Sequence, residues 1–517
     1  LVTPNRAPHS RSERSQMFIN NGYKSVQIRM ASDSTADEET KWEMQRRRVL
    51  AGAAAAGATA LAGCSGGGGD GGDGGGDGDG GGGGDGGGGG GGGGGGTTVN
   101  LLTTYTSPAS KRSYNTATER FKQDNPDVTI SMGYTNWENI YSRLVQAANT
   151  GSWPEMAFFI DNELSLILND QGFTDDPQKV MDPVTEVAGD VADDVPETHY
   201  QAKDGSFYCV QTNNQTPVSW YRTDVMEDVD MGSKPASWNE ELQYVKQAHE
   251  ADNGLYGTSL STARNTYMSD MFLVRLRNAG GNALDPEKNV AFDSQVTRDV
   301  LEHYNELVQY AAPGVESFSY GEAYTNYATD NVAHCLYWGR TTINVVEQTP
   351  DIVEYVVNGH PAKPSNDQAD PDMNTSVMSG DGGQLIKDAT NKDTAIDWFQ
   401  TYLEPDIFVD EYMTGTPGNT TPIYTEHEEP WNDMDFWSEV EHGESIRDLM
   451  VESARTSHPK CRAGPEFPAF PEMAEIVRTP VMSGPASQYY AGDISVDEAT
   501  TQMTERAEQA VANYGGS

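Results

Sequence analysis

Two short stretches of this 517-residue chain carry side chains suited to holding a polar guest. Tyr105, Thr106 and Ser107 follow one apolar run. Asp161 and Asn162 follow another. Hydroxyl, amide and carboxylate groups form hydrogen bonds, and an aromatic ring covers an apolar face. These residue types indicate binding of a polar small molecule.

Enzymatic chemistry has weaker support in the sequence. Neither a zinc-protease H-E-x-x-H pattern nor a C-x-x-C pair is present. Paired carboxylates of the glycosidase kind occur by chance in a chain with 78 Asp and Glu residues, so they decide nothing. We expect no catalytic residues, no metal and no cofactor, and a secreted glycan hydrolase stays open as an alternative.

The elements that position these residues follow from hydrophobic periodicity. The spacing predicts a strand over 97–107, a helix over 109–126, a strand over 127–134, then a helix, a turn and a buried strand over 137–161. Alternating strands and helices predict a parallel sheet, which binds ligands at the carboxyl ends of its strands. Both polar stretches lie at such ends.

The segment before the folded part has the layout of an export signal. Arg46 and Arg47 precede the weakly apolar run 49–63, which resembles a twin-arginine signal. Those 15 residues are too few for a membrane-spanning helix. The run ends in a lipobox-like Leu-Ala-Gly before Cys64, the expected lipidation site. A buried alanine-rich helix is the alternative.

A tether follows Cys64. Residues 66–96 are 26 Gly and 5 Asp. They have no apolar side chains to bury, so nothing offsets the conformational entropy that folding would cost. As a Gly-rich coil this stretch would span about 30 Å. We expect a disordered linker over 64–97, after an upstream extension and signal over 1–63.

Composition restricts the partners. The net charge is −44, which disfavours nucleic acid and anionic lipid. With 24 Tyr, 9 Trp and 14 Phe the chain has enough aromatic residues to build a core. The acidic residues dispersed along it therefore indicate a halophilic surface rather than disorder. Beyond Cys64 there are three cysteines, Cys209, Cys335 and Cys461, with no metal-ligand spacing and at most one disulfide among them.

A series of motifs resembles one known family. They are the F-x-x-x-x-P of 121–126, the W-x-x-x-Y stretch of 137–155, D-G-S-F-Y at 204–208, W-Y-R-T-D at 220–224, PASWNEEL at 235–242, GLYGTSLS at 254–261, and the segments 318–345, 379–403 and 491–511. In this order they resemble the extracellular solute-binding proteins of ABC importers, of the maltose- and oligosaccharide-binding type. The likeness covers nearly all of 98–511. Two positions depart from the pattern: no Pro follows Tyr208, and Arg222 replaces an Asn.

The resemblance implies an α/β, two-lobed fold of the periplasmic-binding-protein type (type II). Each lobe is expected to be a mainly parallel sheet flanked by helices, with ligand between the lobes. The expected bounds are 98–213 and 381–420 for the first lobe, 214–380 and 421–511 for the second, and 512–517 for a tail. Hinge crossovers are expected near 211–216, 378–383 and 416–422, with Gly380, Gly382 and Gly383 supplying backbone freedom.

The resemblance also implies ligand contacts. It places Trp338 as a stacking ring, Asp161 as a ligand carboxylate, and Gln215 at the first crossover. Tyr267, Gly382 and Trp431 complete the expected set with Tyr105, Thr106, Ser107 and Asn162. Each has an ordinary structural alternative: Asp161 as a helix cap, Gln215 as a turn residue, and Trp338, Tyr267 and Trp431 as core packing.

These observations predict a monomeric, lipid-anchored substrate-binding protein on the extracellular face of the membrane. It would deliver a sugar or oligosaccharide to an ABC permease and would not bind nucleic acid. A non-sugar solute, such as a polyamine or a metal complex, remains open, as does an adhesion role.

Overall fold

The computed structural model describes residues 96–137, 139–201, 205–251, 254–364, 377–461 and 469–515, all within one compact unit that spans residues 68 to 517. The predicted signal with Arg46 and Arg47, the lipidation site Cys64 and the tether lie outside the described residues. No helix in the described part is both long and apolar enough to cross a membrane.

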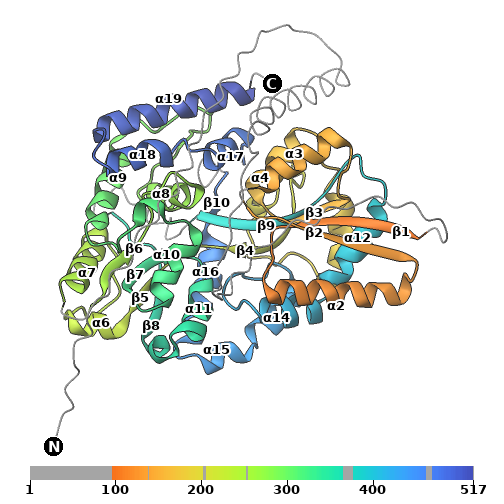
Figure 1. Ribbon diagram of the computed structural model, residues 1–517, viewed down its shortest axis with the longest axis horizontal. Helices are drawn as coiled ribbons and strands as arrows, with labels where there is room; N and C mark the ends of the chain where they lie inside the picture. Colours follow the sequence, from red (N-terminus) through yellow and green to blue (C-terminus); the bar gives the residue numbers. More distant parts are fainter. Residues whose placement is uncertain are drawn as a thin grey trace, which may run out of the picture. The chain divides into compact units, whose positions relative to one another are not determined.

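The first sheet has the strand order β10-β9-β3-β1-β2, with β4 paired to β9 (Figure 1). Its strands are β1 (Thr97–Thr103), β2 (Val128–Tyr134), β3 (Met156–Asp161), β4 (Val210–Gln215), β9 (Val377–Leu385) and β10 (His458–Pro459). β1 runs parallel to both β2 and β3, whereas β9 runs antiparallel to β3 and β4. The predicted strand–helix alternation is therefore confirmed, and the carboxyl ends of β1, β2 and β3 meet at one edge.

The second sheet has the order β6-β7-β5-β8. Its strands are β5 (Val218–Arg222), β6 (Tyr256–Ser259), β7 (Val332–Tyr337) and β8 (Val356–Gly359). Only the β6–β7 pair among these is parallel, which differs from the mainly parallel sheet expected for this lobe. The reason is that β5 enters through a two-residue link from β4 and then pairs antiparallel with both of its neighbours.

Three segments lie together where the chain passes between the first sheet and the second. β4 leads directly into β5, β9 pairs with β4, and Asn214 exchanges backbone hydrogen bonds of 3.0 and 2.8 Å with Thr421. These are the segments expected as hinge crossovers. The lobe bounds given above stay predictions.

The glycines of β9 are explained by close packing. Neither Gly380 nor Gly382 has a positive φ, so no unusual backbone conformation requires them. A Cβ on Gly380 would lie 2.5 Å from the Gln211 amide nitrogen, and one on Gly382 would lie 2.9 Å from the Val210 carbonyl oxygen. Close approach of the crossing strands, rather than backbone freedom, therefore accounts for these two positions.

Helices flank both sheets (Figure 1). Those on the first-sheet side are α2 (Pro108–Asp124), α3 (Ile140–Thr150), α4 (Asn162–Asp170), α5 (Gln178–Ala188), α12 (Lys392–Tyr402), α13 (Pro405–Ile407), the π-helix η4 (Phe408–Met413) and α14 (Thr425–Asn432). Local signals begin them: Ser107 caps α2, and Pro108 occupies its first turn.

The remaining helices belong to the second-sheet side. They are α6 (Thr223–Asp228), α7 (Trp238–Glu250), α8 (Thr266–Asn278), α9 (Gln295–Val308), α10 (Tyr320–Ala328), α11 (Arg340–Gln348), α15 (Asp435–Glu439), α16 (Gly443–Thr456), α17 (Pro471–Arg478), α18 (Ser483–Tyr490) and α19 (Val496–Gly515), with 3-10 turns η2 (Val315–Ser317) and η3 (Pro350–Tyr355). A further 3-10 turn, η1 (Glu197–His199), precedes β4 and contacts β10 of the first sheet. α17 packs against α4 of the first-sheet side and against α8 and α19. It therefore bridges the two halves.

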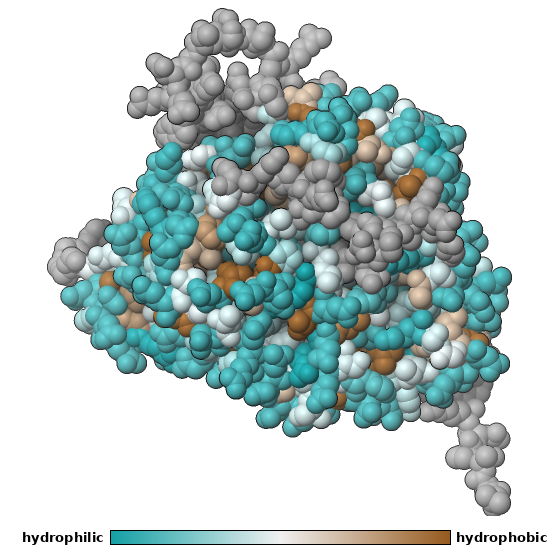
Figure 2. Space-filling view, turned by 180° about the vertical axis from the view of Figure 1, so that it is seen from behind, coloured by the Kyte–Doolittle hydropathy of each residue, from teal (hydrophilic) through white to brown (hydrophobic). Residues whose placement is uncertain are grey.

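Aromatic and aliphatic side chains fill the core of both halves, and hydrophilic residues cover most of the face seen in Figure 2. Cys209 and Cys335 are buried free thiols, and burial raises the pKa of each well above its usual range. Both therefore behave as small apolar side chains.

Candidate functional site

The carboxyl end of β1 meets the crossing strands at a cluster of polar side chains. The Tyr105 ring stacks on Phe159 with centroids 4.4 Å apart. Its hydroxyl donates to the Asp381 carboxylate and accepts a 2.5 Å hydrogen bond from the Gln215 amide. That amide also donates to Asp381. Tyr105, which follows β1, and Gln215 of β4 thus converge on the Asp381 carboxylate of β9.

Asp381 lies opposite Asp161 in the β3–β9 ladder. It is 2% exposed, and burial raises its pKa to about 7, with the Tyr105 hydrogen bond opposing and the nearby Asp161 charge reinforcing the rise. Asp381 therefore holds a proton easily near neutral pH.

Asp161 ends β3 and has two partners. Its Oδ1 accepts a 2.7 Å hydrogen bond from the Leu164 backbone N–H and so caps α4. Arg478, the last residue of α17, donates from Nη1 to both carboxylate oxygens at 2.8 and 2.6 Å. The expected alternative for Asp161, helix capping, is therefore observed, together with an ion pair to a distant segment.

A second ion pair lies beside the first. Lys460 Nζ is 3.2 Å from the Asp270 carboxylate of α8 and 3.9 Å from Glu163 of α4. Arg277 holds this lysine in place by donating to the carbonyl oxygens of Pro459 and Lys460. Burial raises the pKa of Glu163 to about 7, although Lys460 opposes the rise.

Aromatic rings line the second-sheet side. The Tyr320 hydroxyl donates to Asp270 at 2.8 Å, and its ring lies 5.6 Å from Trp338. Trp338 is 7% exposed, and its indole N–H is buried without a hydrogen-bond partner. An indole N–H usually finds a partner when buried, so a ligand oxygen could satisfy it.

We call these side chains the interlobe cluster. Its members are Tyr105, Asp161, Glu163, Gln215, Asp270, Tyr320, Trp338, Asp381, Lys460 and Arg478. It combines carboxylate, amide and phenol groups with aromatic faces. Within the described ranges no three His, Cys, Asp or Glu side chains lie so as to hold a metal ion.

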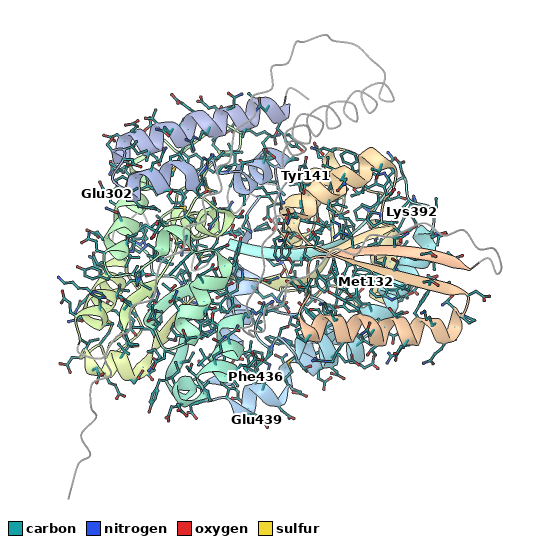
Figure 3. The ribbon with its side chains drawn as sticks, viewed as in Figure 1. Met132, Tyr141, Glu302, Lys392, Phe436 and Glu439 are labelled. Atoms are coloured by element: carbon teal, nitrogen blue, oxygen red, sulfur yellow. The ribbon has the colours of Figure 1, made fainter. Side chains whose placement is uncertain are left out.

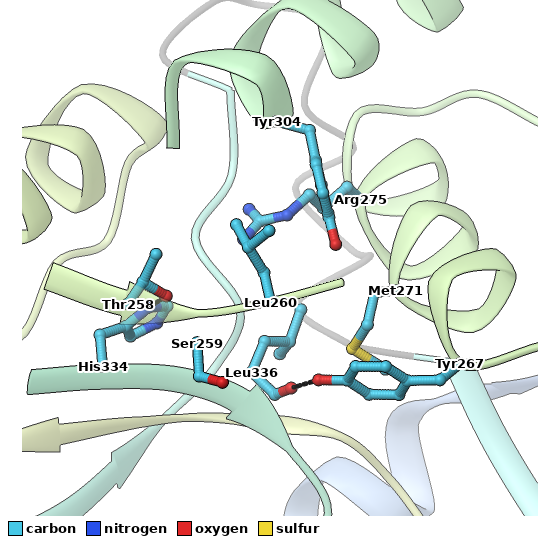
Figure 4. Close-up of a pocket in the computed structure, with 9 residues that line it drawn as sticks. All are labelled: Thr258, Ser259, Leu260, Tyr267, Met271, Arg275, Tyr304, His334 and Leu336. Atoms are coloured by element: carbon cyan, nitrogen blue, oxygen red, sulfur yellow. Dashed lines mark hydrogen bonds between the residues drawn. The ribbon is translucent and has the colours of Figure 1, made fainter. Parts of the chain in front are cut away.

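The structure places the predicted contacts unevenly. Tyr105, Asp161, Gln215 and Trp338 lie in the interlobe cluster. Tyr267 is fully buried, with its ring centroid 6.3 Å from that of Trp338. Its hydroxyl donates to the Leu336 carbonyl oxygen at 3.2 Å in a pocket beside β6 and β7 (Figure 4).

The other five predicted contacts lie outside the interlobe cluster. Thr106 is exposed, Ser107 caps α2 and Gly382 packs inside the crossing strands. Asn162 is buried, with its amide donating to the His199 carbonyl oxygen. Trp431 has no exposed surface and packs on Trp437 at 5.0 Å. As ligand contacts, all ten residues stay predictions.

Six members of the cluster were not predicted from the sequence: Glu163, Asp270, Tyr320, Asp381, Lys460 and Arg478. One signal was available for Asp381, since a carboxylate within the Gly-rich run S-G-D-G-G of a buried strand is unusual. For Lys460 and Arg478 the only signal in the sequence was that basic residues are few, with 34 Lys and Arg against 78 acidic residues.

Comparison with known proteins identifies the class. A family model described as "Bacterial extracellular solute-binding protein" matches residues 105–407. A search of curated protein sequences found no match. The match covers more than half of the chain, and the chain therefore belongs to the bacterial extracellular solute-binding proteins.

Several solved structures share the fold. Maltose-bound MalE3 from T. maritima has a TM-score of 0.65 and 14% identity, over 80% of this chain and 99% of that one. A solute-binding protein from Agrobacterium radiobacter K84 in complex with ribitol gives 0.66 and 15%, over 80% and 98%. A sugar transporter from Arthrobacter chlorophenolicus A6 with bound laminaribiose gives 0.65 and 14%, over 80% and 99%. These likenesses establish the two-lobed α/β fold.

Proposed function

We propose that this chain is the substrate-binding protein of an ABC importer and captures a sugar or oligosaccharide between its two lobes. The observation that carries the proposal is the interlobe cluster, where carboxylates and an amide converge beside the rings of Tyr105, Tyr320 and Trp338. Sugars present hydroxyl rims and apolar C–H faces, and this set of side chains complements both.

The cluster joins parts of the chain that belong to different halves. Tyr105, Asp161 and Asp381 come from the first sheet or its loops, whereas Tyr320 and Trp338 come from elements around the second sheet. A guest that contacts both sets would favour the closed arrangement of the lobes through its differential affinity for it. The closed form is the one that a permease would recognise.

We place the protein on the extracellular face of the membrane, anchored by lipid on Cys64, working as a monomer with a permease and without catalysis of its own. The family assignment and the lipobox-like sequence support this placement.

Purified protein melted against a panel of sugars tests the proposal. A true ligand at one hundred times its Kd should stabilise the fold by about 2.7 kcal/mol, and chromatography should recover the sugar unchanged. Asp381→Asn, which removes the central carboxylate, should weaken the shift, whereas Asp448→Asn on an exposed ion pair should not. Hydrolysis of the sugar, or no stabilisation by any sugar, would overturn the proposal.

A further inference from the structure

Two arginines on the second-sheet side share one small space. Arg264 lies in the loop between β6 and α8, and Arg506 lies on α19. Both reach Gly484 of α18: a Cβ on this glycine would have Arg264 Nε and Arg506 Cζ each at 3.5 Å. The two guanidinium groups therefore lie beside each other, although like charges repel. We call Arg264 and Arg506 the arginine pair.

The arginine pair has no carboxylate partner in the described part of the chain. Arg506 donates to the uncharged side-chain oxygen of Gln502 at 3.1 Å, and Arg264 forms no salt bridge within the described ranges. Burial and the neighbouring charge of Arg264 lower the pKa of Arg506, and no described carboxylate opposes this. In a chain with 78 acidic and only 34 basic residues, two adjacent arginines without an acidic partner call for a counter-charge from outside the chain.

The sequence of α19 keeps acidic side chains away from Arg506. Side chains three and four positions apart are neighbours on a helix surface. The residues at these positions around Arg506 are all uncharged: Gln502, Met503, Gln509 and Ala510. The acidic residues of α19 stand at other positions, so the helix itself offers Arg506 no ion pair.

The amino-terminal end of α18 adds a second attraction for an anion. α18 begins at Ser483 without a side-chain cap, and the start of a helix carries partial positive charge. Ser483 is fully buried, and its hydroxyl has no hydrogen-bond partner among the described residues. Glu302 of α9 lies toward the other end of α18, where its charge acts on Tyr489 (Figure 3). Positive charge and a hydroxyl without a partner therefore coincide at the amino-terminal end.

Both arginines stand on fixed backbone. Asn265, the residue after Arg264, caps α8 and donates to the Phe318 carbonyl oxygen at 2.7 Å. On α19, Met503 and Ala507 flank Arg506 and have no exposed surface. A ligand of the arginine pair would therefore find its backbone already ordered, which lowers the entropic cost of binding.

We propose that the arginine pair binds a small oxyanion, such as phosphate, sulfate or a carboxylate, at the amino-terminal end of α18. Guanidinium groups present N–H donors in a planar arrangement that matches these anions, and a bound anion would offset the repulsion between the two arginines. The site shares no residue with the interlobe cluster, and the inference does not depend on the proposed function. A free anion and an anionic group on the transported solute offer the same chemistry to this site.

Titration calorimetry of the whole chain with sodium phosphate, sulfate and acetate tests the inference. We expect one phosphate or sulfate ion to bind per chain. Arg264→Gln and Arg506→Gln should each raise the dissociation constant for phosphate by about tenfold or more, because each removes charge-assisted hydrogen bonds. Arg506→Lys keeps the charge and should restore part of the affinity. Arg298→Gln is the matched control and should leave it unchanged, because Arg298 of α9 already pairs with Asp293 and Asp497.

Melting curves separate anion binding from a structural role. In buffer without oxyanions, Arg506→Gln should keep or raise the melting temperature, because it removes one of two repelling charges. Added phosphate should raise the melting temperature of the wild-type protein and not that of the variant. A wild-type protein that binds none of the three anions, or variants that bind phosphate as tightly as the wild type, would overturn the inference and leave the proposed function untouched.

A phosphorylated sugar identifies the source of the anion. If it binds more tightly than both inorganic phosphate and the neutral sugar, and Arg506→Gln removes that advantage, the oxyanion belongs to the transported solute. If it binds with the same dissociation constant as inorganic phosphate, and Arg506→Gln weakens both equally, the site takes a free anion. Both results support an oxyanion at the arginine pair.

Discussion

The Arg478–Asp161 ion pair should hold the two halves of the protein together. Arg478 belongs to α17, and Asp161 ends β3, so the pair joins residues 317 positions apart. Replacing the arginine by glutamine removes its charge and nearly preserves its length. The prediction is that Arg478→Gln shifts the ligand-free protein toward an open arrangement and weakens ligand binding.

The size of the effect follows from exposure and geometry. Both side chains are 19% exposed, and one guanidinium nitrogen donates to both carboxylate oxygens. An exposed pair contributes about 0–1 kcal/mol, whereas removing one partner of a buried pair costs about 3–5 kcal/mol. We therefore expect about 1–3 kcal/mol, because Asp161 keeps its hydrogen bond to the Leu164 N–H. That range is roughly a 5- to 150-fold change in equilibrium.

Small-angle X-ray scattering of the ligand-free protein and calorimetry with a bound sugar measure the two consequences. Arg478→Gln should raise the radius of gyration and the dissociation constant together. Arg447→Gln is the matched control, because Arg447 pairs with an Asp448 that is 69% exposed. An unchanged radius of gyration and unchanged affinity in Arg478→Gln would refute the reasoning.

Three further predictions address charge and packing. Burial raises the pKa of Asp381 from 3.8 to about 7, so the folded state binds more protons than the unfolded state between these values. The free energy of unfolding of the protein should therefore fall as the pH rises from about 4 to about 7. Urea unfolding at pH 5 and 8 should show this loss diminished in Asp381→Asn, and an identical pH dependence would contradict the cause. Glu241→Gln should lower the free energy of unfolding by about 3–5 kcal/mol, because it leaves the buried Arg275 guanidinium without the carboxylate that it contacts twice at 2.9 Å. A loss under 1 kcal/mol in urea unfolding would contradict this prediction. Gly380→Ala should cost about 1–3 kcal/mol, because its Cβ would lie 2.5 Å from an amide of β4. Gly321→Ala, whose Cβ would meet nothing within 4 Å, is the control and should not destabilise.

Local patterns predicted the first sheet well. Each of β1, β2 and β3 is an apolar or alternating run, α2 begins at the cap Ser107, and α3 ends at Gly151. Because parallel strands end at a common edge, the positions of Tyr105 and Asp161 at that edge followed from strand order alone. The strand directions of the second sheet could not be predicted in this way, since they depend on pairings between segments far apart in the chain.

The cluster was only partly predictable for the same reason. Asp270, Lys460 and Arg478 come from three separate segments, and no local pattern connects them. The role of Gly380 also depends on long-range packing: its neighbours Gln211 and Asn162 approach from other elements. Sequence periodicity finds an element and its ends, whereas partners across the fold require the structure.

A crystal structure with the sugar that raises the melting temperature most would test the central claim directly. We expect the sugar between the lobes, with its hydroxyls on Asp381 and Gln215 and one ring face on Trp338. Density for the sugar at any other place, with the interlobe cluster unchanged, would contradict the claim.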